Sequence, residues 1–142
     1  MGGISEGYLG KGEIDGHPCM RLFGDVCLEN NGGFIQAALD LASHGNALDA
    51  SSYQGLRLLV RGNEEQYSVH LRTLDNVRPW QSYRRHFIGC DDWKLISLPF
   101  ESFEPHRLNN PLNTSCLLRI GLVAIGRSFR SDLAVAKISF YR

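Results

Sequence analysis

Basic and aromatic residues cluster on short alternating stretches in the middle of the chain. His70 and Arg72 occupy alternate positions of residues 67–73, and Arg61 ends the preceding apolar stretch. A guanidinium presents a planar fork of hydrogen-bond donors, and an aromatic ring can stack on the apolar face of a sugar. The pattern predicts a platform for a carbohydrate or a planar anion on neighbouring strands. Its candidate ligand-binding residues are Arg61, His70, Arg72, Trp80, Tyr83 and Arg85.

The same residues suit a second interpretation. A solvated sheet face often carries arginines whose aliphatic stems cover aromatic rings. Taken without further information, the pattern favours this second interpretation over a binding site.

Catalytic chemistry is the least expected function. The sequence contains no Gly-x-Ser-x-Gly elbow, no phosphate loop and no His-Glu-x-x-His metal motif. The acidic pairs Glu64-Glu65 and Asp91-Asp92 fall in turns, where solvated side chains are the usual finding. We therefore expect a protein that is not an enzyme and that uses no cofactor or metal.

The size and charge of the chain restrict the kinds of protein that it can be. The chain has 142 residues, enough for a single domain (residues 1–142), and its 43% hydrophobic content suits an ordinary core. Fifteen basic residues balance fifteen acidic ones, which argues against nucleic acid as a partner. No apolar run approaches the ~20 residues that cross a bilayer, and the start of the chain shows no secretion signal.

The cysteines point to a reducing compartment. Cys19, Cys27, Cys90 and Cys116 are scattered, without a Cys-x-x-Cys pair. We expect free thiols and a cytoplasmic protein. For an exported chain, a Cys19–Cys27 hairpin bridge would be the first pairing to test.

Short alternating stretches separated by glycine-containing turns indicate an all-β sandwich or barrel. The clearest alternation places Tyr67, Val69 and Leu71 on one face. Gly24-Asp25 is expected to kink a strand pair. The expected strands are residues 20–23, 26–28, 56–61, 67–73, 81–88, 93–98, 116–124 and 133–141.

The stretch 91–105 is the strongest single signal. An acidic turn precedes the apolar strand that begins at Trp93, and Pro99 ends it because proline has no N–H to donate. Phe100 and Phe103 follow as candidates to cover the end of the core.

Two segments are harder to assign. Residues 34–42 have good helix propensity around Gln36-Ala37-Ala38-Leu39 but also alternate, and the β-rich context favours a strand. Residues 104–115 contain Pro105 and Pro111 among polar residues, which predicts a long surface loop.

Ordered motifs give the chain a family resemblance. They are Gly32-Gly33-Phe34, Tyr53-x-Gly55-Leu56-x-Leu58-x-Val60-x-Gly62, Tyr67-x-x-x-Leu71-Arg72, Tyr83-x-x-x-Phe87 and Trp93-x-x-Ile96-x-Leu98-Pro99-Phe100-x-x-Phe103-x-Pro105. With these motifs the chain resembles the complex I intermediate-associated protein 30 family over almost its whole length.

The resemblance implies a β-sandwich jelly roll of the galactose-binding-like type, akin to family-11 carbohydrate-binding modules. Eukaryotic members are linked to assembly of respiratory complex I, which would place a trimmed precursor in mitochondria. It implies a binding or interaction domain whose partner is a protein assembly intermediate. The alternative is a carbohydrate-binding module that holds a glycan on its concave sheet face.

The chain departs from the family pattern in two places. The Met-Gly-Gly-x-Ser stretch of the family follows an N-terminal strand, whereas here it begins at Met1, so we expect a missing strand or a start set too late. An exposed sheet edge would then be covered by residues 1–12, pair with a second copy, or lower the stability. Ala37-Ala38-Leu39 also occupies the place of a family arginine.

Overall fold

The fold is a sandwich of two antiparallel sheets. The computed structural model describes residues 4–14, 17–27, 34–41, 46–78, 80–125 and 129–142, and gives only the backbone for 4–14, 17–18, 25–27, 34–35 and 125. The strands are β1 (Ile4–Ile14), β2 (His17–Cys27), β3 (Phe34–Asp40), β4 (Gly55–Arg61), β5 (Gln66–Thr73), β6 (Ser82–Ile88), β7 (Lys94–Pro99), β8 (Glu104–His106), β9 (Leu117–Ile125) and β10 (Phe129–Tyr141).

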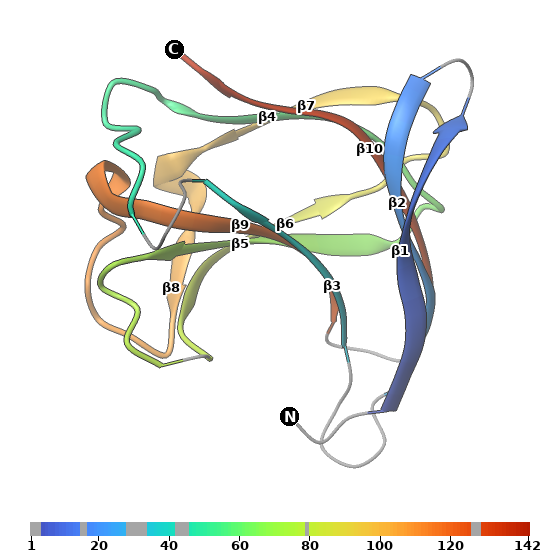
Figure 1. The fold of residues 1–142 in the computed structure, drawn as a ribbon, viewed down its shortest axis with the longest axis horizontal. Coiled ribbons are helices and arrows are strands. Elements are labelled where there is room, and N and C mark those ends of the chain that lie inside the picture. The colour runs from blue at the N-terminus through green and yellow to red at the C-terminus, as the bar shows by residue number, and fades with distance from the viewer. Residues whose placement is uncertain (1–3, 15–16, 28–33, 42–45, 79, 126–128) are drawn as a thin grey trace.

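Each sheet has five strands, and the sequence order is thoroughly shuffled. One sheet runs β1-β2-β10-β4-β7 and the other β3-β9-β5-β6-β8, so that most neighbours are distant in the chain (Figure 1). The predicted fold class, an all-β jelly-roll sandwich of the galactose-binding-like type, is confirmed. The part of the chain described contains no helix long and apolar enough to cross a membrane.

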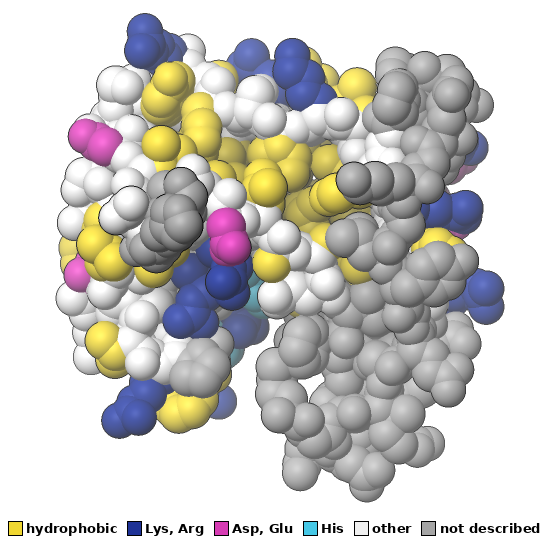
Figure 2. All heavy atoms as spheres, viewed as in Figure 1, with side chains coloured by type: hydrophobic (Ala, Val, Ile, Leu, Met, Phe, Trp, Pro, Cys, Tyr) yellow, Lys and Arg dark blue, Asp and Glu magenta, His cyan; other side chains and the backbone are white. Residues whose placement is uncertain are grey.

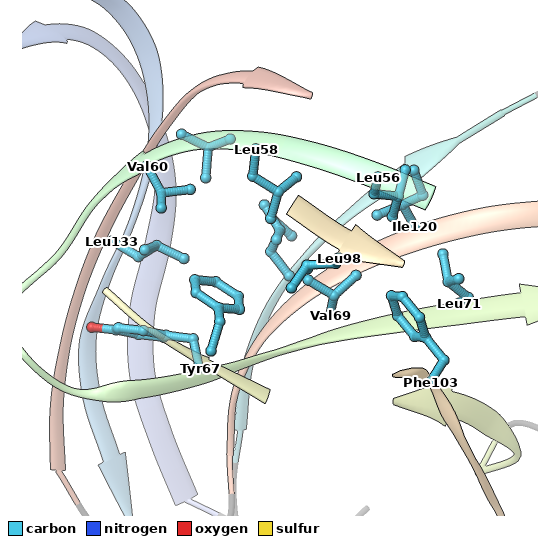
Figure 3. Close-up of a cluster of buried hydrophobic side chains, with 14 of the residues drawn as sticks. Leu56, Leu58, Val60, Tyr67, Val69, Leu71, Leu98, Phe103, Ile120 and Leu133 are labelled. Atoms are coloured by element: carbon cyan, nitrogen blue, oxygen red, sulfur yellow. The ribbon is translucent and has the colours of Figure 1, made fainter. Parts of the chain in front are cut away.

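The core lies between the sheets and follows from the alternation of side chains. Leu56, Leu58 and Val60 of β4 meet Val69 and Leu71 of β5, all at most 1% exposed (Figure 3). Because successive side chains of a strand point to opposite faces, every second residue of each strand points into the core between the sheets. Burying a side chain of this size stabilises the fold by roughly 1.5–3 kcal/mol.

The stretch 91–105 takes the predicted form with one exception. Pro99 ends β7, the 3-10 turn Phe100–Ser102 follows, and Phe100 and Phe103 are buried in the core cluster. Trp93 is only partly buried, because it precedes β7 at the margin of the sheet. The sequence predicts a largely buried Trp93 at the start of an apolar strand, and that prediction is only partly right.

The N-terminal segment forms the outermost strand of its sheet. β1 pairs with β2 along its whole length, from Ile4 opposite Cys27 to Ile14 opposite His17. Of the three outcomes expected for the edge, coverage by the chain's own first residues is the one that the structure shows for residues 4–12. Gly24, with φ 137°, lies inside β2 at the position expected to kink.

The structure rules out a disulfide bridge between Cys19 and Cys27. Both residues lie on the one continuous strand β2, which at ~3.3 Å per residue separates their Cα atoms by about 26 Å. A disulfide needs Cα atoms about 4.4–6.8 Å apart. Cys19, Cys90 and Cys116 are free thiols, as expected.

The predictions for the two segments that were hard to assign have different outcomes. Residues 34–40 form the strand β3, as the β-rich context indicated. The loop predicted over residues 104–115 is partly wrong, because its first three residues pair with β6 as the edge strand β8. Three residues at a sheet edge carry too little alternation to be recognised from sequence.

Candidate functional site

Two of the predicted site residues lie together on one face of a sheet. His70 and Arg72 of β5 point away from the core, because Val69 and Leu71 between and beside them point into it. We call the side of the sheet β3-β9-β5-β6-β8 that faces away from the core the outer face. His70 and Arg72 are at its centre.

The expectation that Arg61 and Tyr83 share this surface is wrong. Arg61 ends β4 in the opposite sheet, where its Nε donates to the Asp91 carbonyl at 2.7 Å. Tyr83 is 0% exposed and belongs to the core. Its hydroxyl donates to the Asn110 carbonyl at 2.9 Å. Its burial raises the pKa of the phenol.

The remaining two candidates lie apart from His70 and Arg72. Arg85 has the same strand parity as Tyr83 and points its guanidinium to the His86 carbonyl. Trp80 is in the loop that joins β5 to β6, 56% exposed, with the Arg78 guanidinium 6.0 Å from its ring centre. The six residues therefore do not form one platform.

The structure adds residues that the sequence did not single out. Strand register places Arg119 of β9 directly opposite Arg72, and Arg84 of β6 directly opposite His70. In the sequence Arg119 is a single charge within an apolar run, and Arg84 occupies one of the polar alternate positions of its strand. No local signal could reveal these pairs, since the pairing partners come from distant parts of the chain.

The outer face can be read strand by strand from the register. Its acidic members are Asp40 of β3, opposite Arg119, and Glu104 of β8, opposite Arg84. The outer-face residues whose side chains the structure describes, from β3 to β8, are Gln36, Ala38, Asp40, Val123, Gly121, Arg119, Gln66, Ser68, His70, Arg72, Ser82, Arg84, His86, Ile88, Glu104 and His106.

Basic side chains gather in a recess. Figure 2 shows dark-blue and cyan side chains in a hollow of the surface, with a single acidic side chain above them. Arg119 Nε donates to Asp40 Oδ1 at 2.8 Å, and Arg84 Nε donates to Ser82 Oγ at 2.9 Å. These bonds fix the directions of two guanidinium groups.

The electrostatics of the face disfavour further positive charge. Burial lowers the pKa of His70 to about 3, and Arg84, His106 and His86 add to the effect. His70 Nε2 is buried and has no hydrogen-bond partner among the residues described. Burial and Arg119 likewise lower the pKa of Arg72.

The opposite side of the recess shows the same effect. Burial and the neighbouring Arg107 lower the pKa of Arg84. Burial, Arg84 and Arg107 lower the pKa of His106. Burial is the largest cause of each of these shifts, and the neighbouring basic groups add to it.

The outer face is not equally open along its length. Ser68 and Val123, which share one register position, are 1% exposed although they point away from the core. β1 and β2 run beside β3 at this side of the molecule (Figure 1). The open part of the face is therefore the part that carries Arg72, Arg119 and Asp40. The ion pair between Arg119 and Asp40 is exposed there.

Sequence comparison decides the family. The sequence profile of complex I intermediate-associated protein 30 matches residues 1–134, nearly the whole chain. The chain belongs to the complex I intermediate-associated protein 30 family. No curated protein sequence matches it significantly.

Solved structures of carbohydrate-binding modules share the fold of this family member. The family 11 module of a cellulosomal cellulase of Clostridium thermocellum superposes with a TM-score of 0.75 at 14% identity, covering 96% of this chain and 82% of that one. The same module in complex with a mixed-linked tetrasaccharide gives 0.74 at 14%, with 96% and 83% covered. A family 30 module of Clostridium thermocellum gives 0.63 at 15%, with 98% and 92% covered.

Proposed function

We propose that this protein is a non-catalytic interaction domain that binds a partner protein, of the assembly-intermediate kind, through its outer face. The observation that carries the proposal is the register of β5, β6 and β9, which gathers Arg72, Arg119 and Arg84 on one open surface. Surface arginines fixed by neighbouring side chains are common anchors of protein interfaces, because a guanidinium pairs with carboxylates in a planar, bidentate way. Membership of a family named for association with complex I intermediates supports a protein as the partner.

A binding role suits the chemistry of the face better than catalysis. The partly buried imidazole of His70 lies near the cation of Arg84, which together with burial lowers its pKa. A general base is normally oriented by a carboxylate or a carbonyl that stabilises its protonated form. Cationic neighbours do the opposite, and so they leave the imidazole as a neutral hydrogen-bonding group.

The thiols that the structure describes support a reducing compartment as the cellular setting. Cys19 is buried and Cys90 and Cys116 are partly buried, and all three are free. Free thiols of this kind persist in a reducing compartment such as the cytoplasm.

Carbohydrate binding is the second candidate. Trp80 is half exposed and could stack on a sugar ring, and a module of similar fold has been solved with a bound tetrasaccharide. Among the outer-face residues whose side chains the structure describes, however, none carries an aromatic ring for stacking. The arginines of this face suit carboxylates better than neutral hydroxyl groups, so the protein partner is the stronger proposal.

A steric variant of Gly121 tests whether the outer face is the binding surface. The atoms nearest to a Cβ added at Gly121 belong to the Gln36 side chain and the His70 carbonyl, at 3.7 Å or more. Gly121→Leu should therefore fold and place an aliphatic side chain at the centre of the face without changing its charge. Affinity capture from the source cell should recover a partner with the wild-type protein and lose it with Gly121→Leu.

The same proteins applied to a glycan array separate the two candidates. Binding of neutral oligosaccharides by the wild-type protein, lost in Gly121→Leu, would replace the protein partner by a glycan. Equal capture of the same proteins by the wild type and by Gly121→Leu would remove the outer face as the site.

A further inference from the structure

The loop that joins β5 to β6 carries apolar side chains at the surface. The structure describes this loop at residues 74–78 and 80–81. Leu74, Val77 and Trp80 are 58%, 77% and 56% exposed, and they are three of the six large hydrophobic side chains that are exposed in the described part of the chain. Single exposed apolar residues are ordinary, but a group of them in one place marks an interaction site.

The polar side chains of the same loop serve its own backbone. Asn76 is only 8% exposed, and its Oδ1 accepts a hydrogen bond of 2.6 Å from the backbone N–H of Thr73. Gln81 Oε1 accepts from the backbone N–H groups of Val77 and Arg78 at 2.9 and 3.0 Å. In folded proteins polar side chains are usually the exposed ones and apolar side chains the buried ones. The loop reverses this distribution at Asn76 and Val77.

Hydrogen bonds also hold both ends of the loop. The Leu74 N–H donates to the Cys116 carbonyl at 3.2 Å, and Gln81 Nε2 donates to the Arg107 carbonyl at 3.0 Å. These bonds place the loop beside the segment that follows β8 (Figure 1). A loop that is ordered before it binds loses less conformational entropy on binding, which favours association.

Arginines lie beside the exposed apolar side chains. The Arg78 guanidinium lies over the Trp80 ring, 6.0 Å from its centre, and Arg107 is exposed. Asp75 is the only acidic residue of residues 74–81. Figure 2 shows basic and hydrophobic side chains side by side at the lower left, where Figure 1 places this loop.

This composition suits the surface of a lipid bilayer. An indole ring is amphipathic and prefers the headgroup level, a guanidinium pairs with lipid phosphates, and aliphatic side chains enter the acyl boundary beneath. A sugar would find only the Trp80 ring to stack on, because aliphatic side chains have no flat face. A specific protein interface buries about 1,200–2,000 Å², which is more than three side chains of one loop provide.

We propose that the loop between β5 and β6 attaches the protein to an anionic phospholipid surface, with Leu74, Val77 and Trp80 inserted among the headgroups and with Arg78 and Arg107 on lipid phosphates. The loop lies outside the outer face, so this attachment goes beyond the proposed function and does not depend on it. Even a single myristoyl chain binds a membrane only marginally. Attachment through this loop is therefore weak and reversible.

Vesicle binding tests the proposal. Co-sedimentation compares vesicles of phosphatidylcholine mixed with phosphatidylserine and vesicles of phosphatidylcholine alone. The proteins are the wild type, the Leu74→Ser/Val77→Ser double variant, Arg78→Gln and Leu95→Ser. Leu95 is the matched control, because it is an aliphatic residue with 59% exposure on β7 of the other sheet. Tryptophan fluorescence reports insertion, since Trp80 is exposed in the free protein.

The wild type should bind the mixed vesicles, and its tryptophan emission should move to shorter wavelength. The double variant should bind at least about tenfold more weakly, and Leu95→Ser within about twofold of the wild type. Arg78→Gln should weaken binding to the mixed vesicles by about fivefold, and added salt should weaken the wild-type complex. Thermal melts check that the variants are folded, which is expected because the replaced side chains are exposed.

Three results would overturn the inference: no binding to either kind of vesicle, equal binding by the double variant, or bound protein whose tryptophan emission is unchanged. Without vesicle binding, self-association that is lost in the double variant would assign the loop to a second copy of the chain. Capture of a protein partner that is lost in the double variant, again without vesicle binding, would assign the loop to that partner. Vesicle binding without capture of any protein would keep this inference and reject the proposed function.

Discussion

The Tyr67 hydroxyl joins the two sheets of the sandwich. It accepts a hydrogen bond of 2.8 Å from the backbone N–H of Asp132 on β10, and it donates one of 2.5 Å to Asn63 Oδ1. Tyr67 is on β5, so the first of these bonds crosses from one sheet to the other. The ring itself is 1% exposed and packs near Phe87 and Phe129.

Tyr67→Phe should therefore lower the free energy of unfolding by about 1–3 kcal/mol, because it leaves the Asp132 N–H and the Asn63 side chain without this partner. Urea denaturation measures the change. Tyr53→Phe is the control, since the Tyr53 hydroxyl makes no hydrogen bond to the described residues while its ring packs on Phe140. Equal stability of the two variants would show that the hydroxyl of Tyr67 does not hold the sheets together.

Phe103 closes the core below the end of β7. It is 6% exposed and belongs to the main hydrophobic cluster (Figure 3). Phe103→Ala should destabilise the protein by about 3–5 kcal/mol through lost burial and the cavity left behind. The control is Leu95→Ala on β7, where the side chain is 59% exposed. This substitution should change the free energy of unfolding by at most about 0.5 kcal/mol. A thermal melt of Phe103→Ala that coincides with the wild type would contradict the placement of this residue.

Two glycines in strands should respond oppositely to a methyl group. A Cβ at Gly55 would lie 2.3 Å from the Leu98 carbonyl oxygen, closer than any such contact in real structures. A Cβ at Gly121 has ordinary contacts. Gly55→Ala should destabilise the β4–β7 pair by about 1–3 kcal/mol, whereas Gly121→Ala should be neutral or stabilise by up to about 1 kcal/mol. Chemical denaturation of the two variants makes the comparison, and the reverse order would refute it.

His70 should make stability depend on pH. In the folded protein its pKa is lowered to about 3 by burial and by Arg84, His106 and His86, whereas the unfolded chain takes up the proton near pH 6.5. Between these values the unfolded state binds more protons, so the contribution of His70 is complete above about pH 6.5 and is lost as the pH falls toward 3. The loss amounts to about 1.4 kcal/mol per pH unit at most.

The comparison with His70→Gln isolates this contribution from the other titrating groups. The difference in free energy of unfolding between wild type and variant should shift by about 1 kcal/mol or more for each pH unit from about pH 6 to about pH 4. Denaturant melts at several pH values provide the measurement. A difference that stays constant across this range would mean that His70 titrates normally in the folded state.

The sequence by itself determined which residues face the core. In residues 56–60 and 67–71 apolar side chains recur at every second position, and those side chains face the core and are at most 1% exposed. The reason is local, since the strand period of two assigns each side chain to a face whatever strand lies next to it. Pro99 likewise ends β7 through its own missing N–H.

Only the tertiary structure decided which strands are neighbours, and with that the candidate site. Arg61 and His70 are close in sequence, yet the chain crosses from one sheet to the other between β4 and β5. Arg72 instead meets Arg119, because β5 pairs with β9. Pairing and register depend on how the whole set of strands buries its apolar faces together, and no single stretch of sequence contains that information.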